Sequence, residues 1–129
     1  MEKKQVKASL MNYRQSPRKM RLVADLVKGK NAERAVLELG FVTKRAALPI
    51  KKLIQSALAN AENNLKLSKE NLVIKKISVD AGKVLKRSMP RAFGRAAMIR
   101  KRTSHINLVL GEPENESAKR KTQNAKATT

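Results

Sequence analysis

The fold of this chain depends on one unusual stretch, residues 82–102, which reads GKVLKRSMPRAFGRAAMIRKR. It lies between two segments with strand character and has too few apolar residues to form a core of its own. Pro90 and Gly94 favour a turn, so the two strands can continue past the core and reverse direction there. With about ten residues per limb at roughly 3.3 Å each, such a hairpin would project about 30 Å. The alternative is a tight turn at residues 80–82; we favour the hairpin, over about residues 80–104.

The same stretch is strongly basic and carries no acidic residue. Its eight cationic side chains are Lys83, Lys86, Arg87, Arg91, Arg95, Arg100, Lys101 and Arg102. A merely solvated loop is the weaker interpretation, because eight unopposed charges would repel one another. The pattern favours an arm that lies in a groove of nucleic acid, contacts phosphates and becomes ordered on binding.

The whole chain is basic as well. Its 129 residues hold 30 Lys+Arg and 10 Asp+Glu, a formal net charge of +20, which indicates a polyanionic partner. The absence of cysteine excludes disulfides, zinc fingers and thiol catalysis. Tyr13, Phe41 and Phe93 are the three aromatic residues, too few to form a base-stacking platform and also help fill a core. Binding through phosphates and shape is therefore favoured over stacking.

Upstream of this stretch, periodicity predicts a strand and three helices. The strand alternates at Val6, Ala8 and Leu10. A first helix starts at Ser16 and Pro17, with Ser16 as its cap, and stops at Gly29; its apolar stripe is Met20, Val23, Ala24 and Val27, widened by Leu22 and Leu26. A second, short helix follows Asn31 and ends before Gly40, with Ala32, Ala35, Val36 and Leu39 on one side.

The third helix has the clearest stripe, made of Ile50, Leu53, Ile54, Ala57, Leu58 and Ala61. Thr43 is a candidate cap, which would place Pro49 inside the helix; we expect a kink there or a separate first turn that ends near Leu48. Two strands follow the helix. Val73, Ile77 and Val79 are expected on one face of residues 72–79, and Ile106, Leu108 and Leu110 on one face of residues 103–110.

A second basic cluster surrounds the start of the first helix. Arg14, Arg18, Lys19 and Arg21 lie where free backbone amides and the helix dipole attract phosphate. The alternative is an ordinary exposed helix face. Lys51 and Lys52 are most simply the solvated side of the third helix.

Catalysis finds little support in the sequence. His105, the single histidine, follows Ser104 in a strand, so the two side chains diverge, and no carboxylate is near to orient the imidazole. The acidic residues show no metal-ligand spacing, and no Gly-rich nucleotide loop is present. We expect no enzyme activity, no cofactor and no metal.

The ends of the chain complete the domain prediction. Residues 1–111 are expected to form a single nucleic-acid-binding domain, and the polar residues 112–129 a disordered tail. The first residues, MEKKQVK, have no apolar stretch behind them, and no run approaches the roughly 20 residues of a membrane span. A soluble, cytoplasmic protein without a membrane partner is expected.

Three segments of the chain resemble one known family. They are LKRSMPRAFGRAAMIRKRTSHI at 85–106, SPRKMRLVADLVKGK at 16–30 and KKLIQSALANAENN at 51–64. In that order they are similar to bacterial-type large-subunit ribosomal protein number twenty-two, a similarity that runs from about Val6 to Leu110. The resemblance implies an α+β fold, with three helices packed on a small antiparallel three-stranded sheet and a long projecting basic β-hairpin.

The resemblance also implies a function. Family members bind the large ribosomal RNA (rRNA) and assist assembly, and the hairpin tip forms part of the nascent-peptide exit tunnel, near the macrolide site. The implied partners are rRNA, neighbouring large-subunit proteins and the nascent peptide, without a homo-oligomer. The implied rRNA-binding residues are Arg14, Arg18, Lys19, Arg21, Lys83, Lys86, Arg87, Arg91, Arg95, Arg100, Lys101, Arg102, Ser104 and His105. The implied tip residues are Ser88, Met89, Pro90, Arg91, Ala92, Phe93 and Gly94.

The chain departs from the family pattern at a few positions. An acidic residue is common where Ala81 stands, a proline where Lys83 stands, and a polar residue where Phe93 stands. Two other classes remain as alternatives. A DNA-bending architectural protein also uses a basic β-arm with a proline near its tip, and a basic enzyme acting on RNA is the third possibility.

Overall fold

The computed structural model describes residues 4–113, in which three helices and three strands follow one another along the chain. The strands and helices are β1 (Gln5–Tyr13), α1 (Pro17–Val27), α2 (Ala32–Phe41), α3 (Ala47–Asn64), β2 (Val73–Pro90) and β3 (Ala96–Gly111). Two single 3-10 turns, Lys69–Asn71 and Ala92–Gly94, precede β2 and β3. Most of the predicted tail, residues 114–129, lies outside the described residues.

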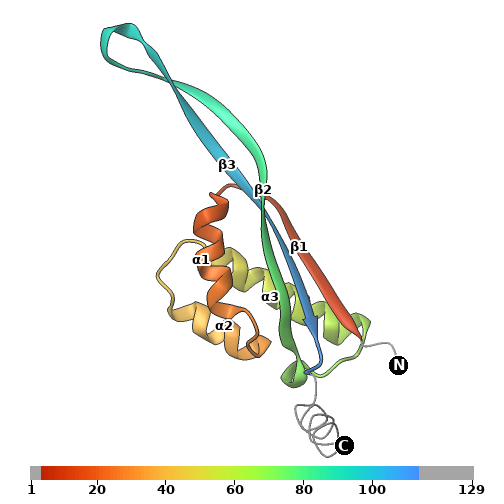
Figure 1. The fold of residues 1–129 in the computed structure, drawn as a ribbon. Coiled ribbons are helices and arrows are strands. Elements are labelled where there is room, and N and C mark those ends of the chain that lie inside the picture. The colour runs from red at the N-terminus through yellow and green to blue at the C-terminus, as the bar shows by residue number, and fades with distance from the viewer. Residues whose placement is uncertain (1–3, 114–129) are drawn as a thin grey trace, which may run out of the picture.

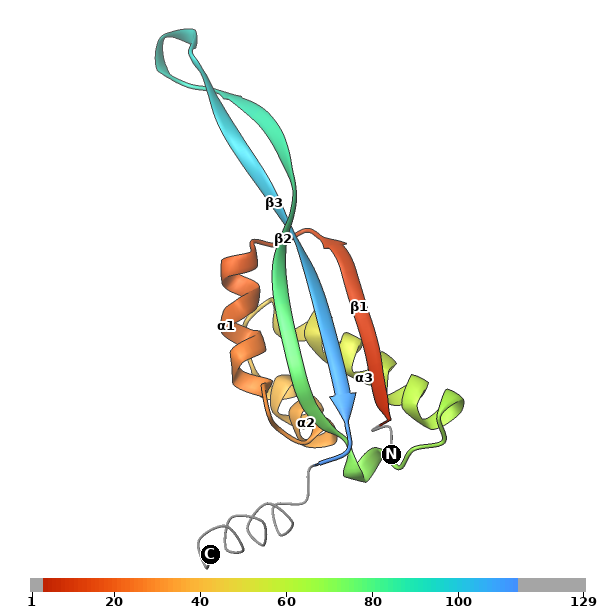
Figure 2. The ribbon, with the colours of Figure 1, turned by 45° about the vertical axis from the view of Figure 1, so that its right-hand side comes forward.

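The sheet is antiparallel with the order β1-β3-β2, so β3 is its central strand. All three helices lie on the same side of the sheet, with α1 and α3 against its strands and α2 packed mainly on α3; within residues 4–113 no helix covers the other face (Figures 1 and 2). Ile106, Leu108 and Leu110 point from β3 toward the helices and are buried, as their alternation predicts. The predicted fold class, α+β with three helices on a three-stranded antiparallel sheet, is confirmed.

The core is aliphatic. Met20, Ile50, Ile54, Leu72 and Ile74 have no exposed surface, and they join α1, α3 and the start of β2 to the sheet. Among residues 4–113 no aromatic side chain is fully buried; Tyr13 packs only partly against the core. This domain therefore gains its stability from close packing of aliphatic side chains.

Helix α1 starts at Pro17 as predicted, but its stripe is narrower than the sequence indicates. Leu22 and Leu26 are 62% and 51% exposed, so the prediction that they widen the buried stripe is wrong. Ser16 occupies the cap position without a side-chain hydrogen bond to the helix. Two residues after the end of α1, Gly29 has φ +79°, which glycine adopts readily. Its backbone N–H donates to the Ile74 carbonyl at 3.1 Å, which joins the α1–α2 loop to β2.

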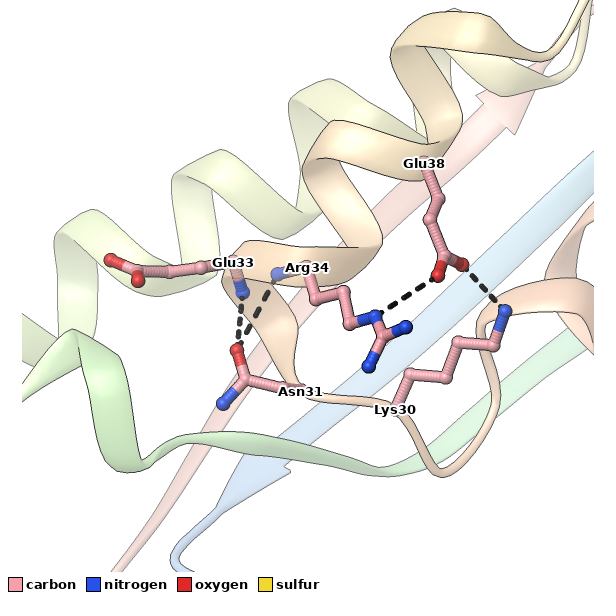
Figure 3. A network of polar contacts seen from close by, with 5 residues as sticks. All are labelled: Lys30, Asn31, Glu33, Arg34 and Glu38. Carbon is pink, nitrogen blue, oxygen red and sulfur yellow. Dashed lines mark hydrogen bonds and ion pairs between the residues drawn. The ribbon is translucent and has the colours of Figure 1, made fainter.

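Helix α2 is capped by Asn31, whose Oδ1 accepts hydrogen bonds from Glu33 N at 3.1 Å and Arg34 N at 3.4 Å (Figure 3). The sequence predicts that this helix ends before Gly40, and that prediction is wrong, because the helix continues to Phe41. Gly40 is thus an interior helical residue and not a C-terminal stop.

Helix α3 begins at Ala47, and Pro49 lies in its first turn. Backbone amides of the first turn have no intrahelical acceptor, so a proline there removes no hydrogen bond. Neither predicted alternative is correct: Pro49 causes no kink, and no separate helical turn ends at Leu48. The residue at the cap position is Ala46, not Thr43.

Strand β2 contains an irregularity that the alternation pattern misses. Its register against β3 shifts between Ile74 and Lys76, which leaves Lys75 as an extra residue. The buried residues before and after this bulge are Ile74, Ile77 and Val79, while Val73 is only partly buried. The prediction for Val73 is therefore wrong, because the bulge changes which residues face the helices.

Beyond the helices, β2 and β3 continue as a two-stranded ribbon, residues 82–102 (Figures 1 and 2). Their pairing runs from Val84 opposite Arg102 to Pro90 opposite Ala96. Residues 91–95 close the ribbon, with Arg91 N donating to Arg95 O at 2.7 Å. Of the two sequence-based interpretations of this stretch, the tight turn at residues 80–82 is thus excluded.

Candidate nucleic-acid interface

The base of the ribbon is the point where three strands become two. Ser104 of β3 lies opposite Tyr13 of β1 and Ala81 of β2. Ser104 is fully buried, and its hydroxyl donates to the Gln15 carbonyl at 2.5 Å. It therefore has no surface to offer to RNA, against the sequence-based prediction; its hydroxyl ties the end of β1 to the central strand.

A second bulge in β2 lies directly beyond this point. The register shifts between Ala81 and Val84, so Gly82 and Lys83 together oppose Thr103. The Thr103 hydroxyl is nearly buried and donates to the Lys83 carbonyl at 2.6 Å. Because bulges increase strand bend and twist, this hydrogen bond helps to set the direction in which the ribbon leaves the domain.

His105 is part of the same joint. Its Nδ1 accepts a hydrogen bond from Asn12 N at 3.1 Å, at a residue of β1 with φ 55°. An accepting Nδ1 requires the tautomer with the proton on Nε2. Ser104 and His105 bond to different backbone groups on opposite sides of the sheet, so they do not form a nucleophile–base pair.

Basic side chains from three separate segments meet beside this joint. They line a groove of about 570 Å³, here called the root groove, whose lining residues are Arg14, Ser16, Arg45, Arg100, Lys101 and Arg102. All five charged residues in it are cations. Four of them were predicted from the sequence, and the fold now brings the β1–α1 connection to the base of the ribbon.

Arg45 is the groove residue that the sequence analysis missed. It belongs to the α2–α3 loop, as does Lys44, and both line a neighbouring hollow of about 600 Å³ together with Arg14 and Lys19. Lys44 and Arg45 form a basic pair just before α3, which is only a weak sequence signal for an RNA-binding site, because such pairs are common on solvated surfaces. Arg45 and the ribbon residues are far apart in sequence, and only the fold shows that they line the same groove.

Arg14 links these hollows to a third one, of about 450 Å³, which also holds Lys83, Thr103 and His105. One arginine thus borders all three hollows around the ribbon base. The predicted RNA-binding residues Lys83 and His105 are brought to this surface, next to the root groove.

The predicted residues on α1 divide into two groups. Arg18 and Lys19 are exposed at the helix start, and the first turn of α1 contains no acidic residue. Arg21 instead donates from Nε and Nη2 to the Val79 carbonyl, at 3.2 and 3.1 Å. Arg21 therefore helps to hold α1 against β2, a structural contact that the sequence did not reveal.

The ribbon carries cations on both faces near its base and none on its limbs near its tip. Residues directly opposite share a face, which places Lys86 beside Arg100 on one face and Arg87 beside Ile99 on the other. Directly opposed like charges destabilise a strand pair. Farther out the pairs are uncharged, Ser88 with Met98, Met89 with Ala97 and Pro90 with Ala96, until Arg91 and Arg95 at the tip.

The carboxylates that do form ion pairs in residues 4–113 lie elsewhere. Glu38 pairs with Lys30 at 2.5 Å and Arg34 at 3.4 Å, on α2 and the connection before it (Figure 3). The hydrogen bond from Lys30 lowers the pKa of Glu38 below its ordinary value. Glu62 pairs with Lys69 at the far end of α3. None of these carboxylates lines the root groove, so its cations keep their charge available for an external anion.

The described part of the chain shows neither a metal-binding cluster nor a membrane-spanning helix. Residues 4–113 contain no group of three or more His, Asp or Glu side chains placed to hold a metal ion. In the same range, no helix combines the length and apolar character needed to cross a bilayer.

Comparison with known proteins identifies the family. The sequence model of the family described as "Ribosomal protein L22p/L17e" matches residues 8–111. The large ribosomal subunit protein uL22 of Herpetosiphon aurantiacus is 53% identical over 110 residues, which cover 85% of this chain and 97% of that protein. The proteins of the same name from Desulfitobacterium hafniense and Bdellovibrio bacteriovorus are 51% and 54% identical over 108 residues, covering 84% of this chain and 95% and 98% of theirs.

The matched region contains all three helices, β2, β3 and the whole ribbon, and all of β1 except its first three residues. Two lines of comparison agree: a family model matches most of the chain, and the relatives are matched over nearly their whole length. The chain therefore belongs to the ribosomal protein L22p/L17e family, a family of structural, non-enzymatic proteins of the large ribosomal subunit.

Proposed function

We propose that this protein binds large-subunit rRNA with the root groove and the basal half of the ribbon, assists assembly, and lines the peptide exit tunnel with the ribbon tip. The observation that carries the proposal is the convergence of Arg14, Arg45 and Arg102 from three chain segments on one groove without a carboxylate. Neighbouring large-subunit proteins and the nascent peptide are its further partners, and it acts as a single copy in the cytoplasmic ribosome.

Electrostatics supports RNA backbone as the ligand of the root groove. Guanidinium groups present planar pairs of N–H donors that match phosphate oxygens, and four of the five groove cations are arginines. In the free protein these groups repel one another across a groove with little screening from acidic residues. A phosphate placed between them removes that repulsion and releases the counterions of the RNA.

The form of the ribbon supports a division of labour between its two halves. The basal half has cations on both faces, so it can contact phosphates on two sides when it lies between RNA segments. The distal limbs, from Ser88 to Pro90 and from Ala96 to Met98, are uncharged. We assign anchoring to the base and the exit-tunnel surface to the tip. Because segments of the RNA on either side of the ribbon must come together around it, binding favours folding of the RNA during assembly.

The test is a competition between large-subunit rRNA and duplex DNA of equal length for the full-length protein, over a range of salt concentrations. We expect rRNA to win. If about 6–10 phosphates are neutralised, affinity falls about 10³- to 10⁵-fold between about 50 and 200 mM salt, by analogy with DNA-binding proteins. Preference for the DNA duplex would favour the architectural DNA-bending alternative, and a flat salt response would contradict phosphate anchoring.

A further inference from the structure

Both phenylalanines of the chain are exposed to solvent instead of being buried in the core. Phe41 has a relative exposure of 87%, and Phe93 is fully exposed. A fully exposed phenyl ring forgoes the stabilisation that burial in a core would give. Stacking is disfavoured by the sequence only if these rings help to fill the core, and the exposure of both rings removes that condition.

Phe93 also has a backbone conformation that its side chain disfavours. It lies at the apex of the ribbon with φ 62° and ψ 27°, and Gly94 follows with φ 70°. Two successive left-handed residues are the pattern for which Asn-Gly is the preferred sequence. A bulky residue at such a position is a conformational outlier. The turn itself gives no reason for a phenylalanine, and within residues 4–113 no packing compensates for it.

The surroundings of the ring are cationic. Arg91 and Arg95 flank it in sequence, and the 2.7 Å hydrogen bond from Arg91 N to Arg95 O holds the two arginines at the ends of the same short loop. An exposed ring with an arginine two residues before it and another two residues after it has the composition of a single-stranded RNA contact, in which the ring stacks on a base and the cations meet its phosphates. A surface made for apolar peptide side chains gains nothing from two adjacent cations.

We propose that Phe93 stacks on an unpaired nucleobase of large-subunit rRNA, with Arg91 and Arg95 against the adjoining phosphates. The inference rests on the proposed function, because it requires the ribbon to lie within rRNA. It adds a contact of a different kind to the phosphate anchoring at the root groove. The affinity that stacking contributes depends little on salt concentration, whereas the affinity that phosphate contacts contribute falls as salt is added.

The first test uses the absence of tryptophan from the chain. A Phe93→Trp variant carries one tryptophan, at the ribbon tip, whose fluorescence is expected to be quenched by the stacked base in large subunits that hold no nascent peptide. Ultraviolet irradiation of subunits with the unchanged protein is expected to give an RNA adduct on the fragment Ala92–Arg95, which trypsin releases. A tryptophan that is unquenched in vacant subunits, or that responds only when a nascent peptide is present, would overturn the inference.

The second test compares Phe93→Tyr, Phe93→Leu and Phe93→Asn in binding to full-length large-subunit rRNA. Tyr retains the ring, Leu retains only apolar volume, and Asn suits the left-handed backbone and keeps the turn intact. We expect Tyr to bind as the unchanged protein does, and Leu and Asn to bind about fivefold or more weakly, with the same dependence of log K on log[salt]. Equal affinity for all four proteins would reject stacking while leaving the proposed function intact. Failure of the unchanged protein to bind rRNA would instead reject the proposed function.

Discussion

A Cβ atom at Gly82 would lie 2.5 Å from Thr103 Oγ1, closer than real side chains approach. The same hydroxyl donates to the Lys83 carbonyl at 2.6 Å, so it is not free to move away. Gly82 and Thr103 thus fit against each other in the bulge where the ribbon leaves the domain. The absence of a side chain at residue 82 allows the threonine to make the bond that fixes this bulge.

We therefore expect Gly82→Ala to destabilise the protein. The added methyl group displaces the Thr103 hydroxyl and leaves the Lys83 carbonyl without its partner, which costs about 1–3 kcal/mol. Urea unfolding measures the loss. The matched control is Gly82→Ala in a Thr103→Ala background, where the methyl group meets no hydroxyl. The second substitution is expected to remove most of the additional cost, and strict additivity of the two effects would contradict this account of the bulge.

Helix α1 offers a direct test of which residues carry the core. Met20 has no exposed surface and Leu22 is 62% exposed, although the two lie two residues apart. Met20→Ala is expected to cost about 2–5 kcal/mol of unfolding free energy. Leu22→Ala is expected to change it by no more than about 0.5 kcal/mol. Chemical denaturation distinguishes them, and equal losses would mean that the packing of α1 is misassigned.

Arg45 is expected to contribute to RNA affinity through phosphate. Replacing Arg45 with Gln removes one groove cation and should lower the slope of log K against log[salt] by about one for large-subunit rRNA. Lys52→Gln removes the same charge from the exposed side of α3, outside the root groove, and should leave the slope nearly unchanged. The salt titration of both variants is the measurement, and an equal fall in slope for both would show that only net charge matters.

Glu38 should make folding stability depend on acidity. Its pKa in the folded protein is lowered by Lys30 and Arg34, so its ionised form contributes stability above its unfolded pKa of about 4.5. That contribution is lost as the pH falls through the lower, folded pKa. Melting temperatures between neutral and acidic pH are expected to fall more for the unchanged protein than for Glu38→Gln. Parallel pH profiles would contradict a lowered pKa at this residue.

Much of the fold was predictable because local signals and the global packing agree. Pro17, Asn31 and the stripe from Ile50 to Ala61 marked the helices, and Pro90 and Gly94 marked the turn of the ribbon. These residues act within a few positions of the structure they determine. The strong, acid-free charge of residues 82–102 likewise pointed to the surface that we propose faces RNA.

The sequence-based predictions were wrong or incomplete where contacts with residues distant in sequence determine burial or position. The bulge at Lys75 exists because β2 must pair with β3, and it moves burial from Val73 to Ile74. Ser104 looked available for RNA, but Gln15, 89 residues away in sequence, accepts its hydrogen bond and the sheet buries it. Arg45 became part of the site only because the fold places it and the ribbon residues Arg100–Arg102 around one groove. No periodicity along the chain encodes such long-range contacts.

The central claim is that the ribbon base is the main anchor of the protein on rRNA, whereas the tip forms the exit-tunnel surface and adds a smaller contact. The register allows a clean shortening of the ribbon. Ser88 pairs with Met98, so replacing Met89–Ala97 by Asn-Gly closes the hairpin in register and removes Arg91, Phe93 and Arg95 together. The opposing variant keeps the full ribbon and reverses three root-groove charges, with Arg45, Arg100 and Arg102 replaced by Glu.

The most direct measurement is the fraction of each variant incorporated into large subunits, in competition with the unchanged protein. We predict that the shortened ribbon is still incorporated, at a level reduced several-fold by loss of the Phe93 contact, because the root groove and the basal cations remain. The charge-reversed protein, which would place carboxylates against phosphates, is predicted to be largely excluded. If the shortened ribbon is excluded as strongly as the charge-reversed protein, anchoring is not confined to the base, and the account is contradicted.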